Sequence, residues 1–212
     1  MTAWRFGRMS FGWSFLVLLW VALLPACSQP VPQLPLLAGD AVLLTFGDSL
    51  TFGTGAGSGE SYPEQLARLT GRTVINAGIP GELAGDGLER LGRELDTHAP
   101  QLLILCHGGN DLLRKRDPLS IQESLERMVE LSRARGIPVL LLGVPRPALF
   151  GLESAKLYYT LTDRMQIPLE ADVIPEVLSQ PALKSDQIHP NAEGYRRVAE
   201  AVFQLLQRSG AL

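Results

Sequence analysis

The sequence predicts an α/β protein, a three-layer α/β/α sandwich built on a mostly parallel sheet of five strands. From residue 41 onward, short apolar runs alternate with longer segments of helical periodicity, the pattern of parallel strands joined by crossover helices. The short runs are apolar throughout, as in strands whose two faces are both covered. The 212 residues, 46% hydrophobic and 19% charged, provide enough core for one stable domain.

Each expected strand is one of these apolar runs. The strands are residues 42–46 (VLLTF), 73–76 (TVIN), 102–106 (LLILC), 139–143 (VLLLG) and a less apolar run at 171–174 (ADVI). Five further segments have the spacing of amphipathic helices: residues 61–69, 82–96, 121–135, 154–166 and 192–208. No internal repeat is apparent, so residues 41–212 are expected to form a single domain.

The first 26 residues have the features of a secretory signal peptide. Arg5 and Arg8 provide a cationic start, and an unbroken apolar run follows at residues 15–24. That run is shorter than the roughly 20 residues that a membrane-spanning helix needs. We therefore expect this segment to direct export rather than to remain as a transmembrane anchor.

A cysteine directly follows the expected signal peptide. The sequence Leu24-Pro25-Ala26-Cys27 resembles a bacterial lipobox, in which the cysteine is lipidated, whereas Leu24 fits an ordinary A-x-A cleavage site poorly. The alternative is plain secretion with an incidental cysteine. We expect a bacterial lipoprotein held to the membrane through Cys27, on the periplasmic side of the outer membrane if the cell is Gram-negative, with proline-rich residues 27–40 as a tether.

Charge and cysteine content exclude several classes of partner. Without residues 1–26 the chain keeps 17 Lys and Arg against 22 Asp and Glu, a net charge of −5, which argues against nucleic acid and anionic lipid as partners. If Cys27 is lipidated, Cys106 has no partner for an intramolecular disulfide, and we interpret it as a buried apolar residue. A monomer is expected.

Three motif-bearing loops follow the first three expected strands. They begin at Gly47-Asp48-Ser49-Leu50, Gly78-Ile79-Pro80-Gly81 and Gly108-Gly109-Asn110-Asp111. Ligands of open parallel sheets bind at the carboxyl ends of the strands. We therefore expect the three loops to meet at one rim and to form the functional site.

Ser49 is the candidate nucleophile, and a serine hydroxyl needs a base beside it. Of three histidines, His98 lies in a polar stretch and is expected at the surface, while His107 is expected to shape its loop. His189 follows Asp186 by three positions, a spacing that can bring the carboxylate onto the imidazole Nδ1 and leave Nε2 free. We therefore predict Ser49, His189 and Asp186 as catalytic residues; a helix-capping Asp186 beside a surface histidine is the alternative.

An oxyanion that forms during acyl transfer needs hydrogen-bond donors held in advance. Asn110 offers two uncharged N–H donors, whereas the neighbouring Asp111 can only accept when it is ionised. Gly81 can bring its backbone amide close to a ligand because it has no Cβ, although it also fits an ordinary turn. Asn110 and Gly81 are therefore the candidate donors.

These residues resemble the sequence blocks of the SGNH hydrolases, the GDSL-type esterases and lipases. Ser49 matches block I, Gly81 block II, Asn110 block III, and His189 with Asp186 block V; the likeness runs from about residue 42 to the C-terminus. The similarity is greatest to the bacterial thioesterases, lysophospholipases and arylesterases of the family. It implies a flavodoxin-like fold and an oxyanion hole formed by the Ser49 amide, the Gly81 amide and the Asn110 side chain.

The resemblance also implies the reaction. We expect hydrolysis of carboxylic esters or thioesters, such as lysophospholipids, acyl thioesters or aryl esters, through an acyl-enzyme on Ser49. A carbohydrate O-acetylesterase of the same superfamily is the alternative. Asp48 and Asp111 are expected to brace loops. Residues 145–152 resemble a mobile substrate-side loop, in which Leu149 and Phe150 either contact an acyl chain or pack on the core.

Other chemistries fit less well. The glycines of residues 53–59 lack the G-x-G-x-x-G spacing of a dinucleotide site, and Thr51 stands where the G-x-S-x-G elbow of α/β-hydrolases needs glycine. Cys106 and His107 are neighbours on a strand and point to opposite faces, so they cannot pair as a cysteine hydrolase. No cofactor and no metal is expected. An inactive binding module would not need the complete set of reactive residues.

Overall fold

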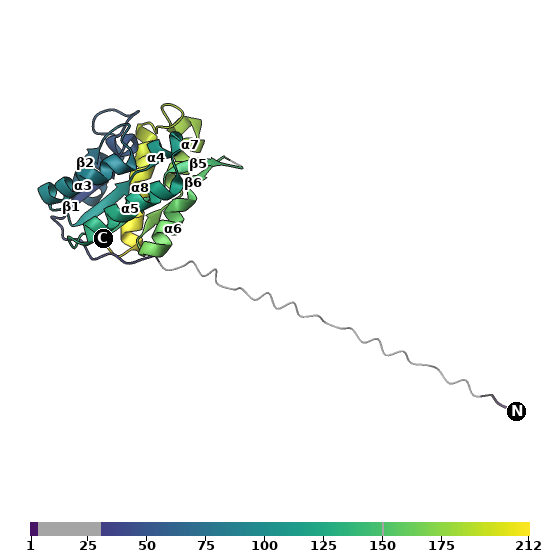
Figure 1. Cartoon of the computed structure of the whole chain (residues 1–212). Helices are drawn as coiled ribbons and strands as arrows, with labels where there is room; N and C mark the ends of the chain where they lie inside the picture. Colours follow the sequence, from purple (N-terminus) through teal and green to yellow (C-terminus); the bar gives the residue numbers. More distant parts are fainter. Residues whose placement is uncertain (4–30, 150) are drawn as a thin grey trace. The chain divides into compact units, whose positions relative to one another are not determined.

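The computed structural model describes residues 1–3, 31–149 and 151–212 (Figure 1). The expected signal peptide, apart from its first three residues, and Cys27 lie outside the described residues. The chain divides into two units, Met1–Pro30 and Val31–Leu212, and the second contains all the described helices and strands. Within the described part, no helix combines the length and the apolar character that crossing a membrane requires.

A five-stranded parallel sheet forms the centre of the Val31–Leu212 unit. Its strands are β1 (Val42–Gly47), β2 (Thr73–Gly78), β3 (Leu102–Cys106), β4 (Val139–Leu142) and β7 (Leu169–Glu170), in the order β2-β1-β3-β4-β7. Every pairing in this sheet is parallel. All residues of β3 and β4 are buried, which explains why their sequences are apolar without alternation.

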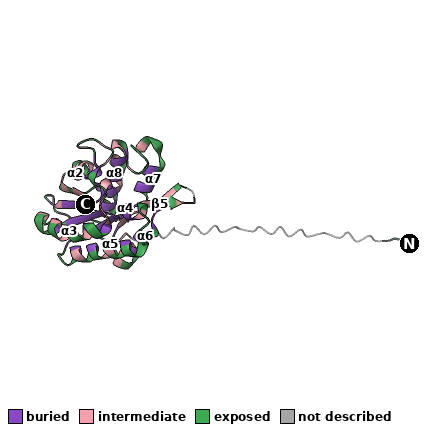
Figure 2. Ribbon diagram, turned by 45° about the horizontal axis from the view of Figure 1, so that its top comes forward, coloured by how far each residue is buried: buried purple, intermediate pink, exposed green. Residues whose placement is uncertain are grey.

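Helices cover both faces of the sheet and complete the predicted three layers. On one face α2 (Tyr62–Thr70) packs against α8 (Ala192–Arg208), which also contacts α7 (Val173–Ser179); on the other, α3 (Ala84–His98), α5 (Pro118–Arg133) and α6 (Lys156–Met165) lie side by side (Figure 1). The predicted α/β/α sandwich is therefore confirmed. Burial is greatest between the layers, where purple dominates Figure 2.

Local capping explains where several helices begin. Ser61 and Glu64 form a capping box at the start of α2, each side chain accepting a hydrogen bond from the other's backbone N–H. Asp117 caps α5, and Pro118 occupies its first position, where a missing N–H costs nothing. Asn191 caps α8 by accepting from the N–H of Gly194. This last cap places the start of α8 directly after His189.

The expected strand at residues 171–174 is wrong. The fifth strand lies just before it, at Leu169–Glu170, and Val173 is the first residue of helix α7. The carboxylate of Glu170 accepts hydrogen bonds from the N–H groups of Asp172 and Val173, so the chain turns out of the sheet and into the helix at this point. Four residues of mixed polarity are too few for periodicity to separate a strand from a helix start.

A β-hairpin occupies the region expected to be a loop. Strands β5 (Pro145–Ala148) and β6 (Gly151–Ser154) pair antiparallel and project from the edge of the unit (Figure 1). Because Ser154 belongs to β6, the helix expected at residues 154–166 begins only at Lys156. Two short helices, α1 (Ser49–Phe52) and α4 (Gly109–Leu113), and the 3₁₀ turn η1 (Pro181–Leu183) complete the described elements.

Part of the proline-rich segment belongs to the compact unit. The N–H of Leu34 donates to the carbonyl of Ser209 at 2.8 Å, and that of Leu37 to the carbonyl of Ala211 at 3.0 Å. Leu37 is buried, and the Arg72 guanidinium donates to its carbonyl. Leu34 and Leu37, which lie within the residues 27–40 that we expected to form a tether, are therefore packed beside the C-terminal residues.

Candidate active site

The register of the sheet brings the three motif loops to one edge. Gly47, the last residue of β1, pairs with Gly78 of β2 on one side and with Cys106 of β3 on the other. A Cβ on Gly47 would lie 1.9 Å from the Cys106 carbonyl oxygen, and one on Gly78 would lie 2.1 Å from the backbone nitrogen of Phe52. Glycine is required at both positions because the loops leave the strands in close contact.

Ser49 is the first residue of the short helix α1, immediately beyond β1. Asp48 caps this helix: its carboxylate accepts from the N–H of Leu50 at 3.1 Å. Burial raises the pKa of the Asp48 carboxyl above its usual value, against the opposing effects of His107 and of hydrogen bonds from backbone N–H groups. Asp48 thus braces the turn that presents Ser49, as predicted.

Ser49, His189 and Asp186 form a continuous hydrogen-bonded chain. The Oγ of Ser49 lies 3.0 Å from Nε2 of His189, and Nδ1 of His189 lies 2.8 Å from Oδ2 of Asp186. The second carboxylate oxygen of Asp186 accepts from the N–H groups of Ile188 and His189, both at 2.8 Å. These contacts hold the turn between η1 and α8 in the shape that directs the imidazole toward Ser49.

The electrostatics of this chain suit general-base catalysis. The hydrogen bond from His189, with further bonds from the backbone N–H groups of Ile188 and His189, holds the pKa of the Asp186 carboxyl below its usual value. An ionised Asp186 can only accept, so Nδ1 of His189 carries the proton and Nε2 is free to accept from the Ser49 hydroxyl. The side chain of His189 is 13% exposed and that of Asp186 is 52% exposed, so the carboxylate is open to solvent.

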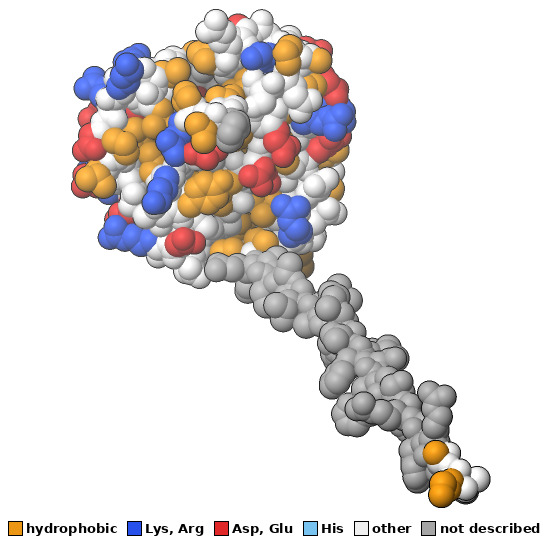
Figure 3. Space-filling view, turned by 90° about the vertical axis from the view of Figure 1, so that its right-hand side faces the viewer, with side chains coloured by type: hydrophobic (Ala, Val, Ile, Leu, Met, Phe, Trp, Pro, Cys, Tyr) orange, Lys and Arg blue, Asp and Glu red, His pale blue; other side chains and the backbone are white. Residues whose placement is uncertain are grey.

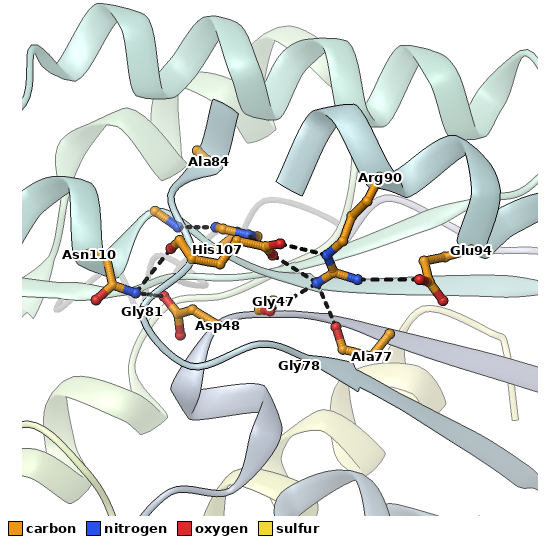
Figure 4. A network of polar contacts seen from close by, with 12 residues as sticks. Gly47, Asp48, Ala77, Gly78, Gly81, Ala84, Arg90, Glu94, His107 and Asn110 are labelled. Atoms are coloured by element: carbon orange, nitrogen blue, oxygen red, sulfur yellow. Dashed lines mark hydrogen bonds and ion pairs between the residues drawn. The ribbon is translucent and has the colours of Figure 1, made fainter. Parts of the chain in front are cut away.

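Asn110 is the second residue of α4. Its Nδ2 donates to the backbone carbonyl of Glu82 at 3.0 Å and lies 3.4 Å from Oδ2 of Asp48, the contact drawn in Figure 4. Asn110, Ser49 and His189 all line the same cavity, so the structure brings these three predicted residues together. Asp111 accepts from the N–H of Ala84 at 2.9 Å and braces the neighbouring loop, as predicted.

The structure accounts for Gly81 through its backbone turn, the alternative that we left open, and the role of its amide as an oxyanion donor stays a prediction. A Cβ at this position would meet no atom within 4 Å, so lack of space is not the reason for glycine here. Its φ of 81° instead lies in the left-handed region that side chains disfavour. The glycine is therefore required by the backbone turn of the loop that leads to Glu82.

An apolar cavity of about 170 Å³ opens beside Ser49. Besides the reactive residues, its walls are mainly aliphatic: Leu50, Leu113, Val144, Pro145, Pro147, Leu152, Leu178 and Ile188. Pro145, Pro147 and Leu152 come from the β5–β6 hairpin. Figure 3 looks onto the side from which the hairpin projects, where hydrophobic side chains are interspersed with both signs of charge.

Leu149, which follows strand β5, is not among the residues that line this cavity. Leu149 is 88% exposed, so it does not pack on the core, and that alternative is wrong. The other alternative, contact with an acyl chain, stays a prediction. Phe150 lies outside the described residues. The hairpin contributes through its two strands instead, which the expectation of a loop at residues 145–152 did not foresee.

The other two histidines and Cys106 lie outside this constellation. His98 is part-exposed and 3.5 Å from Glu94, a surface position as predicted. Cys106 is fully buried, and burial raises the pKa of its thiol well above the usual value, so it is held as the unreactive thiol. Among the described residues, no group of three or more His, Cys, Asp or Glu side chains is arranged to hold a metal ion.

Sequence reasoning missed a buried polar cluster directly behind the site. His107 contacts Glu82 through Nε2 at 3.0 Å, and Arg90 contacts the same carboxylate through Nε at 2.6 Å and Nη2 at 2.8 Å. Partial burial alone would raise the pKa of the Glu82 carboxyl, but the hydrogen bonds from His107 and Arg90 lower it. One signal was available: Arg90 interrupts the buried face of α3, between Gly87 and Leu91.

The chain is similar in sequence to one protein family and to several of its characterised members. The profile of the family described as GDSL-like Lipase/Acylhydrolase matches residues 45–197. The chain is 32% identical over 174 residues to an arylesterase of Vibrio mimicus, covering 77% of this chain and 87% of the arylesterase. It is 30% identical over 172 residues to thioesterase 1/protease 1/lysophospholipase L1 of Escherichia coli strain K12, covering 78% and 83%. The solved SGNH-hydrolase family esterase AlinE4 is similar with a TM-score of 0.62 at 33% identity, covering 80% of this chain and 96% of AlinE4.

Proposed function

Because this chain belongs to the GDSL-like Lipase/Acylhydrolase family, the SGNH hydrolases, and is a carboxylic ester hydrolase, we propose that it cleaves acyl esters through an acyl-enzyme on Ser49. The observation that carries the proposal is the hydrogen-bonded chain from Ser49 through His189 to Asp186. His189 is the general base, and Asp186 orients its ring and stabilises the imidazolium. The oxyanion is held by the amides of Ser49 and Gly81 and by the side chain of Asn110.

The reaction then proceeds in two balanced halves. The Oγ of Ser49 attacks the acyl carbon as its proton passes to Nε2 of His189, and the carbonyl oxygen becomes an oxyanion beside Asn110. When the intermediate collapses, His189 gives that proton to the departing alkoxide or thiolate. Water then attacks the acyl-enzyme, His189 takes its proton and returns it to Ser49, and the carboxylic acid leaves.

The substrates are esters or thioesters with an apolar acyl or aryl group, such as lysophospholipids, acyl thioesters and aryl esters. The aliphatic walls of the cavity support this choice over a carbohydrate O-acetylester, whose sugar needs a polar cleft. Leu152 and Pro147 of the hairpin lie on these walls and would contact the acyl group. The relatives from Vibrio mimicus and Escherichia coli, an arylesterase and a thioesterase 1/protease 1/lysophospholipase L1, support the same substrate class.

Rates on p-nitrophenyl esters from acetyl to palmitoyl test the substrate class. We expect kcat/KM to rise from acetyl to a longer acyl chain, and Leu152→Ala to reduce that rise while leaving acetyl hydrolysis nearly unchanged. Leu36→Ala is the matched control, because Leu36 is exposed and outside the cavity. A preference for acetyl esters together with deacetylation of acetylated sugars would favour the O-acetylesterase. A fluorophosphonate probe that fails to label Ser49 would favour an inactive binding module.

The location of the enzyme is a separate proposal that rests on sequence. The apolar run at residues 15–24 and the lipobox-like sequence that ends at Cys27 support an exported, lipid-anchored monomer that faces the periplasm if the cell is Gram-negative. Ser28, rather than aspartate, after the cysteine supports sorting to the outer membrane. Cys27→Ser should release the protein from membranes and abolish palmitate incorporation, and a variant that keeps both would contradict the proposal.

A further inference from the structure

Glu82, Arg90 and His107 form a buried charged cluster that the reaction above does not use. Their side chains are 7%, 9% and 0% exposed, and two nitrogens of Arg90 and one of His107 converge on the Glu82 carboxylate (Figure 4). Glu94, also on α3, lies 3.8 Å from the far side of Arg90. Buried ion pairs contribute little net stability, because desolvation offsets the attraction, so stability alone is a weak reason for this arrangement.

The hydrogen bonds allow only one arrangement of the cluster. The N–H of Gly108 donates to Nδ1 of His107 at 3.0 Å, so Nδ1 carries no proton and the ring proton must be on Nε2. That Nε2–H donates to Oε2 of Glu82, and Arg90 donates to both carboxylate oxygens. The ring of His107 fits because residue 87 is glycine: a Cβ there would lie 2.5 Å from Nε2. The Glu82 carboxylate is therefore held from two sides.

Arg90 of the cluster also contacts the ends of strands β1 and β2, from which two of the motif loops leave. Nη2 of Arg90 also donates to the carbonyl of Ala77 at 2.8 Å and lies 3.4 Å from that of Gly47 (Figure 4). Ala77 is near the end of β2, and Gly47 is two residues before Ser49. The guanidinium face also lies 3.9 Å from the centre of the Phe46 ring. These contacts fix the position of Glu82 relative to the end of β1, which Ser49 follows by two residues.

The backbone of Glu82 contacts the oxyanion donor directly. Its carbonyl accepts from Nδ2 of Asn110 at 3.0 Å, and the same nitrogen makes a longer contact of 3.4 Å to Oδ2 of Asp48. A hydrogen bond of that length is weak, and a developing oxyanion can replace it. The orientation of the Asn110 donor thus depends on where the Glu82 carbonyl lies.

We propose that Glu82 is a positioning residue for the hydrolysis: its carboxylate, clamped by Arg90 and His107, fixes the carbonyl that aims the Asn110 amide at the oxyanion. The proposal rests on the assignment of Asn110 to the oxyanion hole. Misplacement of a reacting or stabilising group by about 1 Å can lower a rate by about 10²-fold. Glu82 therefore acts on the rate only through Asn110 and touches no substrate.

A double-mutant cycle tests this dependence. Glu82→Gln keeps the size of the side chain but presents an N–H₂ to a donor, so one contact to Arg90 or His107 is lost and the loop shifts. In the otherwise native protein we expect kcat to fall by about 10- to 100-fold, with KM within about threefold. In an Asn110→Ala background, the same change should lower kcat by less than about threefold, because the donor that Glu82 aims is already absent.

Leu91→Ala is the matched control. Leu91 is fully buried in α3, next to Arg90 in sequence, and is not part of the hydrogen-bonded cluster. Its replacement lowers the melting temperature by loss of packing, and the effect on kcat should be the same in the native and the Asn110→Ala backgrounds. All variants are assayed well below their melting temperatures. If Glu82→Gln does not fold, Arg90→Lys, which keeps the charge and loses the two-pronged contact, takes its place in the cycle.

Three results would overturn the proposal, and they are distinguishable. If Glu82→Gln lowers kcat by the same factor in the native and the Asn110→Ala backgrounds, its effect is a general structural one. A folded Glu82→Gln protein with native kcat would show that the clamp is not needed. A native kcat in Asn110→Ala alone would remove the oxyanion assignment as well, whereas the first two results leave that assignment intact.

Discussion

Nε2 of His189 lies 3.0 Å from Oγ of Ser49, although 140 positions separate the two residues in sequence. Ser49 follows the first strand of the sheet, and His189 lies in the turn that precedes the last helix. A backbone bridge between Lys184 and Pro190 closes that turn, and within it the Asp186 carboxylate contacts Nδ1 of His189. The contact therefore depends on the complete fold. Each of the two residues supplies a reactive group, so catalysis should be lost when either one is changed.

Ser49→Ala and His189→Ala should each leave a folded protein with almost no esterase activity. Nucleophile and base act as a unit, so loss of either should lower kcat by a factor on the order of 10⁶. Rates on a p-nitrophenyl ester and melting curves measure the two effects. Appreciable turnover by purified Ser49→Ala protein would contradict the assignment of the nucleophile.

Asp186→Asn should damage the enzyme at least as much as Asp186→Ala. Asparagine presents N–H₂ to Nδ1 of His189 and so favours the tautomer with the proton on Nε2, which cannot accept from Ser49; the expected loss in kcat is about 10⁴-fold. Because the Asp186 site is half exposed, alanine admits water there and leaves either tautomer possible. Comparison of kcat for the two variants is the measurement, and a nearly native Asn variant would show that Asp186 only supports the turn.

Variants of Asn110 distinguish a role in the oxyanion hole from one in loop structure. Asn110→Ala removes a donor and should lower kcat by about 10²- to 10³-fold with a small change in KM. Asn110→Asp keeps the shape, but its carboxylate repels the oxyanion, so it should be at least as damaging. If Asn110 only braced its loop, aspartate would keep most activity and alanine would lower the melting temperature, so kcat, KM and melting temperature are measured for both.

The stability that the Glu82 carboxylate provides should disappear in acid. Its pKa in the folded protein is below the 4.5 of an unperturbed glutamate, because bonds from His107 and Arg90 outweigh the opposing effect of burial. A depressed folded pKa means that the contribution is complete above the unfolded value and is lost as the pH falls through the folded value. The difference in melting temperature between the native protein and Glu82→Gln should therefore be constant near neutral pH and shrink below about pH 4.5.

Asp96→Asn is the control for that pH series. Asp96 pairs with Arg135 at the surface, where solvent screens the interaction, so its loss should change the melting temperature little at any pH. If Glu82→Gln stayed equally destabilised at pH 3 and pH 7, the loss would come from shape rather than from the charge of the carboxylate.

Cys106 should resist alkylation in the native protein. It is fully buried, and the raised pKa of its thiol leaves almost none of the reactive thiolate at neutral pH. Iodoacetamide should modify the peptide that contains Cys106 only after denaturation, as mass spectrometry can show. Rapid modification of native protein with loss of activity would contradict this and would reopen a role for the thiol.

The central fold was predictable because its strands are buried on both faces. Runs such as residues 102–106 and 139–143 have no polar position, and only a covered parallel sheet explains several of them in one chain. Residues 145–148 gave no such signal, since two prolines disfavour a strand, and the hairpin forms directly after strand β4. At residues 171–174 the chain turns into a helix because the Glu170 carboxylate accepts from two backbone N–H groups. Hydrophobic periodicity carries no information about such a contact.

The candidate reactive residues could be predicted from the sequence, but the buried cluster that contacts them could not. Ser49, Asn110 and His189 belong to motifs that follow strands or precede a helix, so chemistry and position together identify them. The cluster joins Glu82 and His107, which lie in two different loops, with Arg90 of α3, and only the spatial arrangement makes them neighbours. The catalytic roles themselves stay predictions for the variants described above.

The hydrogen bonds from Leu34 to Ser209 and from Leu37 to Ala211 have a consequence for the order of events during synthesis. A ribosome makes residues 34 and 37 early, but their acceptors come only after helix α8 has been made. That early stretch therefore cannot complete its backbone pairing until translation is over or nearly so. A segment that is made early thus docks late, and it stays accessible until the last helix has been made.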